Sequence, residues 1–209
     1  SRQQDKFDVG TPVNWLDWEE CQLARVAVEK KAKAAQGAAG LDVLHDLCLL
    51  TLLTYQPPDR VGVYRTLQLG TSLIDAGGGV YKLNISRPDA HKTAAVFGPT
   101  KTTLPRPICD SISAYVNAAV LETGMFLFYK GIDASKPLEP STWTERVKTV
   151  FKTHSARGVA LAPKELRAAF VTFLKSSECS NAALKAAATA MRHSSKTQAS
   201  HAYDKNEND

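Results

Sequence analysis

The sequence predicts an α+β fold that is mainly α-helical and includes a small antiparallel three-stranded sheet. The first observation behind this prediction is helical spacing: apolar residues recur three and four positions apart over most of the chain. The second is a change of period after the glycine run at residues 77–79, because residues 80–85 alternate apolar and polar as strands do. The third is size, since 209 residues, 44% hydrophobic and 22% charged, can build a substantial core and exclude disorder throughout.

Two helices are predicted in the first quarter of the chain. The first begins after Asn14, a residue type that accepts hydrogen bonds at helix starts, and continues until Gly40 stops it. From Leu41 the apolar residues crowd together, which is typical of a helix buried on most sides. Pro57-Pro58 ends this second helix, and residues 59–65 are predicted to form a turn or a short helical piece.

The predicted strands follow. Residues 66–70 are the first candidate, and residues 77–85 form the second after their glycine turn. Residues 94–97 and 102–104 are the candidates for the third. We expect these short segments to pair as one small antiparallel sheet.

The second half of the chain is predicted to be helical. Helices are expected over residues 110–121, over 141–151 with Ser141 as the N-cap, and from Pro163, whose fixed φ suits a first helical turn. In this last helix Lys164 and Arg167 border a stripe of apolar residues, so both can face one ligand. Ser180 is predicted to cap a further helix, which breaks at residues 193–195 before a short final helix that contains Tyr203. The apolar stripe after Pro163 consists of Leu166, Ala169, Phe170, Phe173 and Leu174.

Composition and charge narrow the class of protein. No apolar stretch approaches the roughly 20 residues of a membrane-spanning helix, and residues 1–7 have no signal-peptide core, so we expect an intracellular protein without membrane contact. The four cysteines stand singly, which is typical of reduced thiols and not of zinc sites. Residues 1–140 hold 15 basic and 15 acidic side chains, whereas residues 141–209 hold 11 and 6, which favours a polyanion-facing segment there.

Three motifs carry the chemistry. Residues 191–197 (MRHSSKT) followed by Tyr203 resemble the C-terminal box of the tyrosine recombinase, or phage integrase, family. Residues 163–170 (PKELRAAF) resemble its second box, with Lys164 where histidine is usual, and residues 52–60 (LLTYQPPDR) resemble its first, with Arg60 as the box arginine. Arg65 is the alternative arginine. Val63 occupies the place where an acid often follows the first arginine.

The resemblance implies a fold, a domain division and a set of roles. It covers residues 13–205 as one catalytic domain of the fold shared with type IB topoisomerases, between a flexible segment 1–12 and a disordered tail 206–209, and the family's N-terminal core-binding domain is not in this chain. It implies Tyr203 as the nucleophile and Lys92, before the third strand, as the general acid, with Lys101 and Lys82 as alternatives. The resemblance also implies four residues that stabilise the charge of the transition state: Arg60, Arg167, His193 and Lys164. It implies DNA contacts from Arg60, Lys92, Lys164, Arg167, Arg192 and Lys196.

These roles make physical sense for metal-free phosphodiester cleavage. Charge develops on two phosphate oxygens in the transition state, and guanidinium groups bind such oxygens in a two-donor fork. The expected function is therefore site-specific recombination of double-stranded DNA through a 3′-phosphotyrosyl intermediate, without cofactor, metal or ATP. The resemblance implies a homotetramer on DNA, a monomer alone, and nuclear action if the host is eukaryotic. The Pro-Pro-x-Arg form of the first box resembles members from eukaryotic mobile elements or large viruses.

Two other functions fit the same motifs. A type IB topoisomerase shares the catalytic core but relaxes supercoils without exchanging partners. A DNA-binding module derived from such an enzyme would bind DNA in a salt-dependent way and form no covalent adduct. Lys164 and Val63 are the departures that raise this second alternative.

Overall fold

The structure is a computed structural model that describes residues 15–34, 40–85, 99–177 and 179–192. Within these residues no helix is both long and apolar enough to cross a bilayer. The helices are α1 (Trp18–Ala34), α2 (Leu41–Thr54), α3 (Val61–Arg65), α5 (Arg106–Ala118), α6 (Pro140–His154), α7 (Pro163–Ser176) and α8 (Asn181–Ala190), and the strands are β1 (Leu73–Asp75), β2 (Tyr81–Ile85), β3 (Thr100–Thr103), β4 (Tyr129–Lys130) and β5 (Asp133–Pro137).

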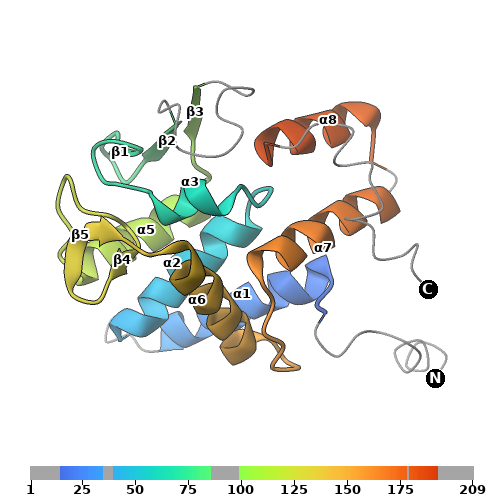
Figure 1. The fold of residues 1–209 in the computed structure, drawn as a ribbon, viewed down its shortest axis with the longest axis horizontal. Coiled ribbons are helices and arrows are strands. Elements are labelled where there is room, and N and C mark those ends of the chain that lie inside the picture. The colour runs from blue at the N-terminus through green and yellow to red at the C-terminus, as the bar shows by residue number, and fades with distance from the viewer. Residues whose placement is uncertain (1–14, 35–39, 86–98, 178, 193–209) are drawn as a thin grey trace.

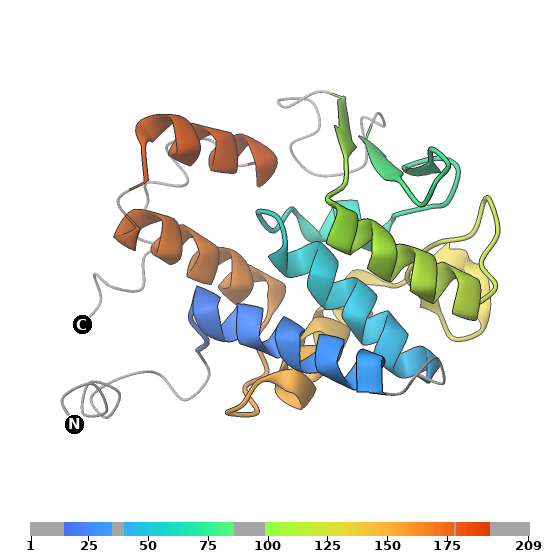
Figure 2. The same cartoon turned by 180° about the vertical axis from the view of Figure 1, so that it is seen from behind.

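The buried helix α2 forms the centre of the molecule. Its residues 48–54 are all buried, as the crowded apolar sequence predicts. Helices α1, α5 and α6 pack around it, and α7 packs against α1 and α6 (Figures 1 and 2). This packing holds the end of α2 and the start of α7 in fixed places, and both carry motif residues.

The predicted three-stranded antiparallel sheet is present, with the order β1-β2-β3. Its register pairs Leu73 with Leu83 and Lys82 with Thr103. The first strand, however, lies at residues 73–75 and not at 66–70. Leu69 instead exchanges backbone hydrogen bonds with Met125 and Gly124 (2.9 and 2.8 Å), so this extended segment pairs with a loop outside the sheet. The 94–97 candidate lies outside the described residues.

Several helix boundaries differ from their predicted positions for local reasons. The residue that caps α1 is Asp17, which exchanges side chain-to-backbone hydrogen bonds with Glu20 (2.7 and 3.0 Å), and Asn14 lies outside the described residues. Helix α5 begins four residues earlier than predicted, at Arg106. Helix α6 begins at Pro140 with Glu139 as its N-cap, so Ser141 lies inside the first turn.

A second, two-stranded sheet was not predicted. Strands β4 and β5 form a hairpin whose turn contains Gly131, at φ +63°, and the fully exposed Ile132. Its strands are short, and most of their residues are polar or exposed. An alternation of apolar and polar residues is therefore missing from the sequence, and with it the usual signal of a strand.

Helix α8 begins as predicted and has little buried surface. The Ser180 hydroxyl accepts a hydrogen bond from the backbone N–H of Ala183 (3.2 Å), which confirms the predicted cap. Within the helix only Ala187 and Ala188 are buried, and Met191 follows as the buried C-cap. The helix lies between the end of α7 and strand β3 in both views (Figures 1 and 2).

Candidate active site

Arg60 stands at the junction between α2 and α3. The Pro57-Pro58 pair ends the α2 segment, and Arg60 is the extended N-cap residue of α3. Its guanidinium reaches across to the end of α8, where Nε and Nη2 donate to the backbone carbonyl of Arg192 (3.3 and 3.0 Å). This is the two-donor fork that the first motif predicts for a phosphate, here filled by a carbonyl.

Arg167 approaches the same place from α7. Its side chain is 8% exposed, and Nη2 donates to the carbonyl of Met191 (2.8 Å). Lys164, one turn earlier, is exposed at the surface. The two residues differ in exposure, because the Arg167 side chain turns inward while Lys164 faces solvent.

The two arginines of the separate motifs thus meet at consecutive peptide groups. Met191 and Arg192 are neighbours, so their Cα atoms are only about 3.8 Å apart. Arg60 bonds to the second carbonyl and Arg167 to the first. Residues far apart in the sequence are brought together at the turn that precedes His193.

Arg192 was predicted to contact DNA, but the structure turns its side chain inward. It is 5% exposed, Nε forms an ion pair with Asp59 Oδ2 (2.9 Å), and Nη1 donates to the Thr100 hydroxyl on β3 (3.2 Å). Its backbone has φ +53°, the left-handed conformation that commonly ends helices. Arg192 therefore joins α8 to the first motif and to the sheet.

Asp59 is the residue of this site that sequence reasoning missed. Burial raises the pKa of its carboxyl, and the Arg192 charge and the Arg60 backbone N–H act in the opposite direction. Asp59 accepts that N–H through Oδ1 (2.6 Å), and its own N–H donates to the Tyr64 hydroxyl (3.2 Å). A single acid beside an arginine is too common in sequences to be noticed without the fold.

A cleft of about 420 Å³ lies beside the Asp59–Arg192 pair. Its walls come from the turn after α2, from β2 and β3, and from α8. Most of its lining is apolar, so it exposes little charge apart from the ion pair itself. The lining residues are Gln56, Pro57, Asp59, Tyr64, Leu83, Thr100, Thr102, Ala186, Thr189, Ala190 and Arg192.

The alternatives to Arg60 and Lys92 point elsewhere in the structure. Arg65 donates to the carbonyl of Leu138, before α6, and so lies away from Arg167. Lys82 and Lys101 are exposed and share the outer face of the sheet, because side chains alternate along a strand and Thr100 faces Arg192. Lys92, His193, Lys196 and Tyr203 lie outside the described residues.

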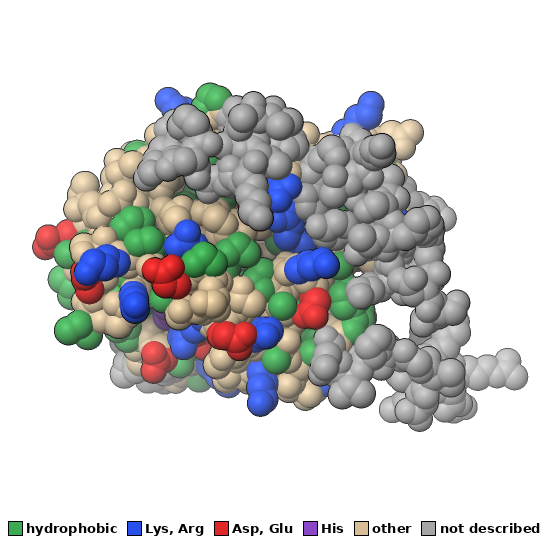
Figure 3. All heavy atoms as spheres, in the orientation of Figure 1, with side chains coloured by type: hydrophobic (Ala, Val, Ile, Leu, Met, Phe, Trp, Pro, Cys, Tyr) green, Lys and Arg blue, Asp and Glu red, His purple; other side chains and the backbone are tan. Residues whose placement is uncertain are grey.

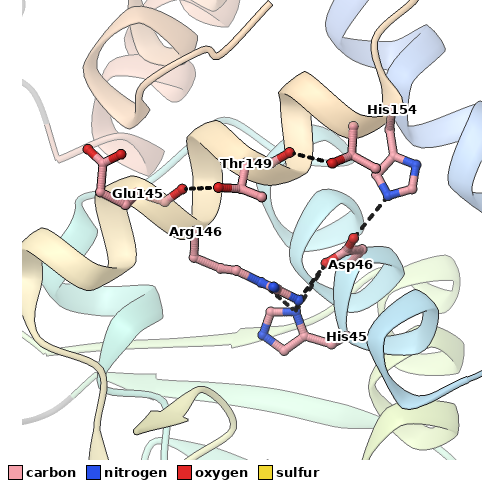
Figure 4. Close-up of polar contacts among 7 residues, drawn as sticks. His45, Asp46, Glu145, Arg146, Thr149 and His154 are labelled. Atoms are coloured by element: carbon pink, nitrogen blue, oxygen red, sulfur yellow. Dashed lines mark hydrogen bonds and ion pairs between the residues drawn. The ribbon is translucent and has the colours of Figure 1, made fainter. Parts of the chain in front are cut away.

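A second polar cluster lies between α2 and α6 (Figure 4). Asp46 Oδ1 pairs with Arg146 Nη2 and Oδ2 with His154 Nε2, both at 2.9 Å, and Arg146 also donates to His45 Nδ1 (2.9 Å). Burial raises the pKa of Asp46, but these partners together hold it well below its usual range. Sequence reasoning missed the cluster because its members lie far apart in the chain.

The described residues contain no group of three or more His, Cys, Asp or Glu side chains placed to hold a metal ion. On the face shown in Figure 3, acidic and basic side chains are interspersed over the described surface. At the end of α8 the described positive charge comes from Arg60, Arg167 and Arg192.

The helical layers, the three-stranded sheet and the order of the elements define the class of fold. It is mainly α-helical with a small three-stranded antiparallel sheet, as the sequence predicts, and a solved recombinase has a similar fold. The crystal structure of XerA recombinase matches this chain with a TM-score of 0.59 and 14% sequence identity, and the match covers 95% of this chain and 65% of that protein. No protein-family model and no curated protein sequence matches the chain.

Proposed function

We propose that the chain is the catalytic domain of a tyrosine recombinase, which cuts and rejoins duplex DNA through a 3′-phosphotyrosyl intermediate. One observation carries the proposal: within a recombinase fold, Arg60 and Arg167 converge on the peptide groups of Met191 and Arg192. Two guanidiniums held side by side form a site for a doubly coordinated phosphate. The domain is proposed to span residues 13–205.

The phosphate would bind where the arginines meet. A guanidinium has five N–H donors, and the bonds of Arg60 to the Arg192 carbonyl use two of them, so its other edge can take a phosphate oxygen. Arg167 supplies the second cation. The exposed Lys164 adds a point charge from the first turn of α7. His193, which follows Arg192 in the sequence, is proposed to donate to the same phosphate.

Cleavage would proceed by transfer of the phosphate to Tyr203. The phenol oxygen attacks phosphorus, the bond from phosphorus to the 5′ oxygen breaks, and the tyrosine proton passes to water. Lys92 donates the proton that the departing 5′-hydroxyl needs. A 5′-hydroxyl from the exchanged strand then reverses these steps, so the bond energy is conserved and neither ATP nor a metal is required.

The sheet register supports Lys92 as the general acid. The segment that joins β2 to β3 contains Lys92, and β3 reaches the site through the bond between Thr100 and Arg192. Lys82 and Lys101 lie on the opposite face of these strands. This placement disfavours Lys82 and Lys101, and Lys92 of the connecting segment is therefore the proposed general acid.

The substrate, the oligomeric state and the cellular location follow from the same proposal. The substrate is proposed to be double-stranded DNA, bound by four copies during exchange and by a chain that is monomeric when free. We propose an origin in a eukaryotic mobile element or a large virus, with action inside the cell and in the nucleus of a eukaryotic host.

A suicide-substrate assay tests the proposal. The protein is incubated with nicked, phosphorothiolate-bridged duplex DNA in EDTA, and adducts that resist SDS are counted. We expect an adduct from wild type, none from Tyr203→Phe, and the wild-type amount from Tyr55→Phe, a matched change at a surface tyrosine 37% exposed. An adduct that persists in Tyr203→Phe would contradict the proposal.

The adduct assay, run beside plasmid relaxation and two-site recombination assays, separates the two alternatives. Intact DNA binding without an adduct on any substrate would favour the non-catalytic binding module. An adduct together with relaxation of supercoiled plasmid, but without recombination between two sites, would favour a topoisomerase.

A further inference from the structure

The first motif and the end of α8 form a closed ring of contacts, which we name the clasp and define as Asp59, Arg60 and Arg192. Asp59 and Arg60 are adjacent in the chain. The Asp59 carboxylate binds the Arg192 side chain (2.9 Å), and the Arg192 carbonyl receives the Arg60 side chain (3.0 Å). Each member is therefore held by the other two.

Asp59 is the fixed point of the clasp. Its side chain is 8% exposed, its Oδ1 accepts the Arg60 backbone N–H, and its own N–H donates to the Tyr64 hydroxyl. Tyr64 is buried and is held in turn by the side-chain amide of Gln56 (3.1 Å). These contacts tie the carboxylate to the turn after α2 and to the buried Tyr64.

Arg192, together with the buried side chain of Met191 beside it, holds the end of α8 to the rest of the molecule. Only small side chains of α8 are buried, and burial of an alanine removes little apolar area from water. The Asp59 and Thr100 bonds of Arg192 fix the peptide groups to which both Arg60 and Arg167 bond. The position of those two carbonyls therefore sets the distance between the guanidinium groups of Arg60 and Arg167.

Val63, where an acid is expected in the first motif, is apolar and 1% exposed, so the carboxylate of this turn comes from the residue before Arg60. We propose that Asp59 is a positioning residue of the active site, which acts through Arg192 to place Arg60 against a DNA phosphate. This inference rests on the proposed function. Asp59 touches neither phosphate nor nucleophile in this role.

The first arm of the test needs no catalytic activity. The Nε–H signals of arginine in ¹⁵N NMR report hydrogen bonding at Arg60 and Arg192 directly, and Arg146 Nε, bonded to His45 (3.3 Å), is an internal reference. We expect Asp59→Asn to speed hydrogen exchange at Nε of both Arg60 and Arg192 and to leave Arg146 unchanged. Unchanged exchange at Arg60 would overturn the inference.

The second arm measures single-turnover adduct formation and DNA affinity together. Misplacement of a reacting geometry by about 1 Å can cost about 100-fold in rate, so we expect Asp59→Asn to slow the adduct by about 10- to 100-fold while DNA affinity changes less than about threefold. Asp59→Glu, which keeps the carboxylate, should recover part of the rate. Equal loss of affinity and rate, or no loss, would overturn a positioning role.

A second route to the same effect avoids removing a buried charge. Thr100→Val deletes the hydroxyl that holds Arg192 Nη1, and Thr103→Val makes the same change on the opposite face of β3 as a control. We expect only Thr100→Val to slow the adduct and to speed exchange at Arg192. If wild type forms no adduct, the proposed function fails, and the NMR arm still decides whether Asp59 controls Arg60.

Discussion

At the scale of single residues, burial and partners distinguish the arginines of the chain. Arg60 and Arg167 face the end of α8, Arg65 is bonded to the Leu138 carbonyl, and Arg106 forms an exposed ion pair with Asp110 on the surface of α5. All carry the same charge. Of these four, Arg60 and Arg167 are the two that bond to adjacent peptide groups, and we propose that they bind one phosphate together.

The Arg60→Lys and Arg167→Lys variants test this distinction. A lysine keeps the charge but has no planar fork, so we expect single-turnover adduct formation to fall about 100- to 1,000-fold, as when one transition-state donor is removed. Arg106→Lys is the matched control and should keep the wild-type rate. Similar rates for all three variants would show that charge alone, and not fork geometry, is required.

At the scale of elements, the Asp46 cluster joins three helices. Asp46 of α2 pairs with Arg146 and His154 of α6, and Lys31 of α1 reaches His154 Nδ1 (3.5 Å). The cluster holds α2 against α6, and the end of α2 carries the first motif with Arg60. Its role is structural.

We expect Asp46→Asn to lower the free energy of unfolding by about 2 kcal/mol at pH 7, because Arg146 and the buried His154 lose the carboxylate to which they bond. The pKa of Asp46 is held below its unfolded value, near about 3.9, so this stabilisation is present above that pH and is lost as the pH falls. Urea titrations at several pH values should show the difference from wild type narrowing below about pH 4.

Asp110→Asn is the control for this measurement. It removes a carboxylate from an exposed i,i+4 pair on α5, and such pairs contribute under about 0.5 kcal/mol. If Asp46→Asn and Asp110→Asn had the same free energy of unfolding, the cluster would make no contribution to stability.

Helix α8 is predicted to open locally. Its few buried residues are mostly small, so its amides should exchange with solvent faster than those of the buried helix α2. Ser180→Ala removes the N-cap, at a cost of about 1 kcal/mol, and should increase exchange in residues 184–190 about fivefold. Hydrogen–deuterium exchange measures this, with α2 amides as the reference that must not change.

At the scale of the whole molecule, sequence patterns predicted most of the features that depend on interactions between residues close in the sequence. The helical class, the three-stranded sheet and the Ser180 cap followed from residue spacing. The resemblance of the motifs selected Arg60 and Arg167, which the structure brings to adjacent peptide groups. Contacts between segments that are distant in the sequence could not be predicted from these patterns. The Arg192 side chain turns inward because Asp59 and Thr100, which are distant in the sequence, lie beside it. Residues 66–70 pair with the loop at residues 124–125, whose sequence has no periodic pattern of apolar residues.

DNA affinity is a property of the whole surface and should depend on salt. If Arg60 and Arg167 together neutralise one phosphate and Lys164 neutralises a neighbouring one, affinity should fall about 12-fold between 50 and 200 mM salt. Lys164→Ala should reduce the slope of log K against log salt by about 1, and Lys148→Ala, which removes a lysine paired with Glu145 on α6, should leave it unchanged. Equal slopes for wild type and Lys164→Ala would remove Lys164 from the interface.

The β4–β5 hairpin has a practical consequence. Its turn, at Gly131 and the fully exposed Ile132, lies at the opposite end of the molecule from α8 (Figure 1). Exposed loop tips tolerate insertions well. A capture tag placed between these two residues would attach the protein to a sensor surface with the end that carries the arginines turned outward, so that immobilised molecules could engage long duplexes from solution.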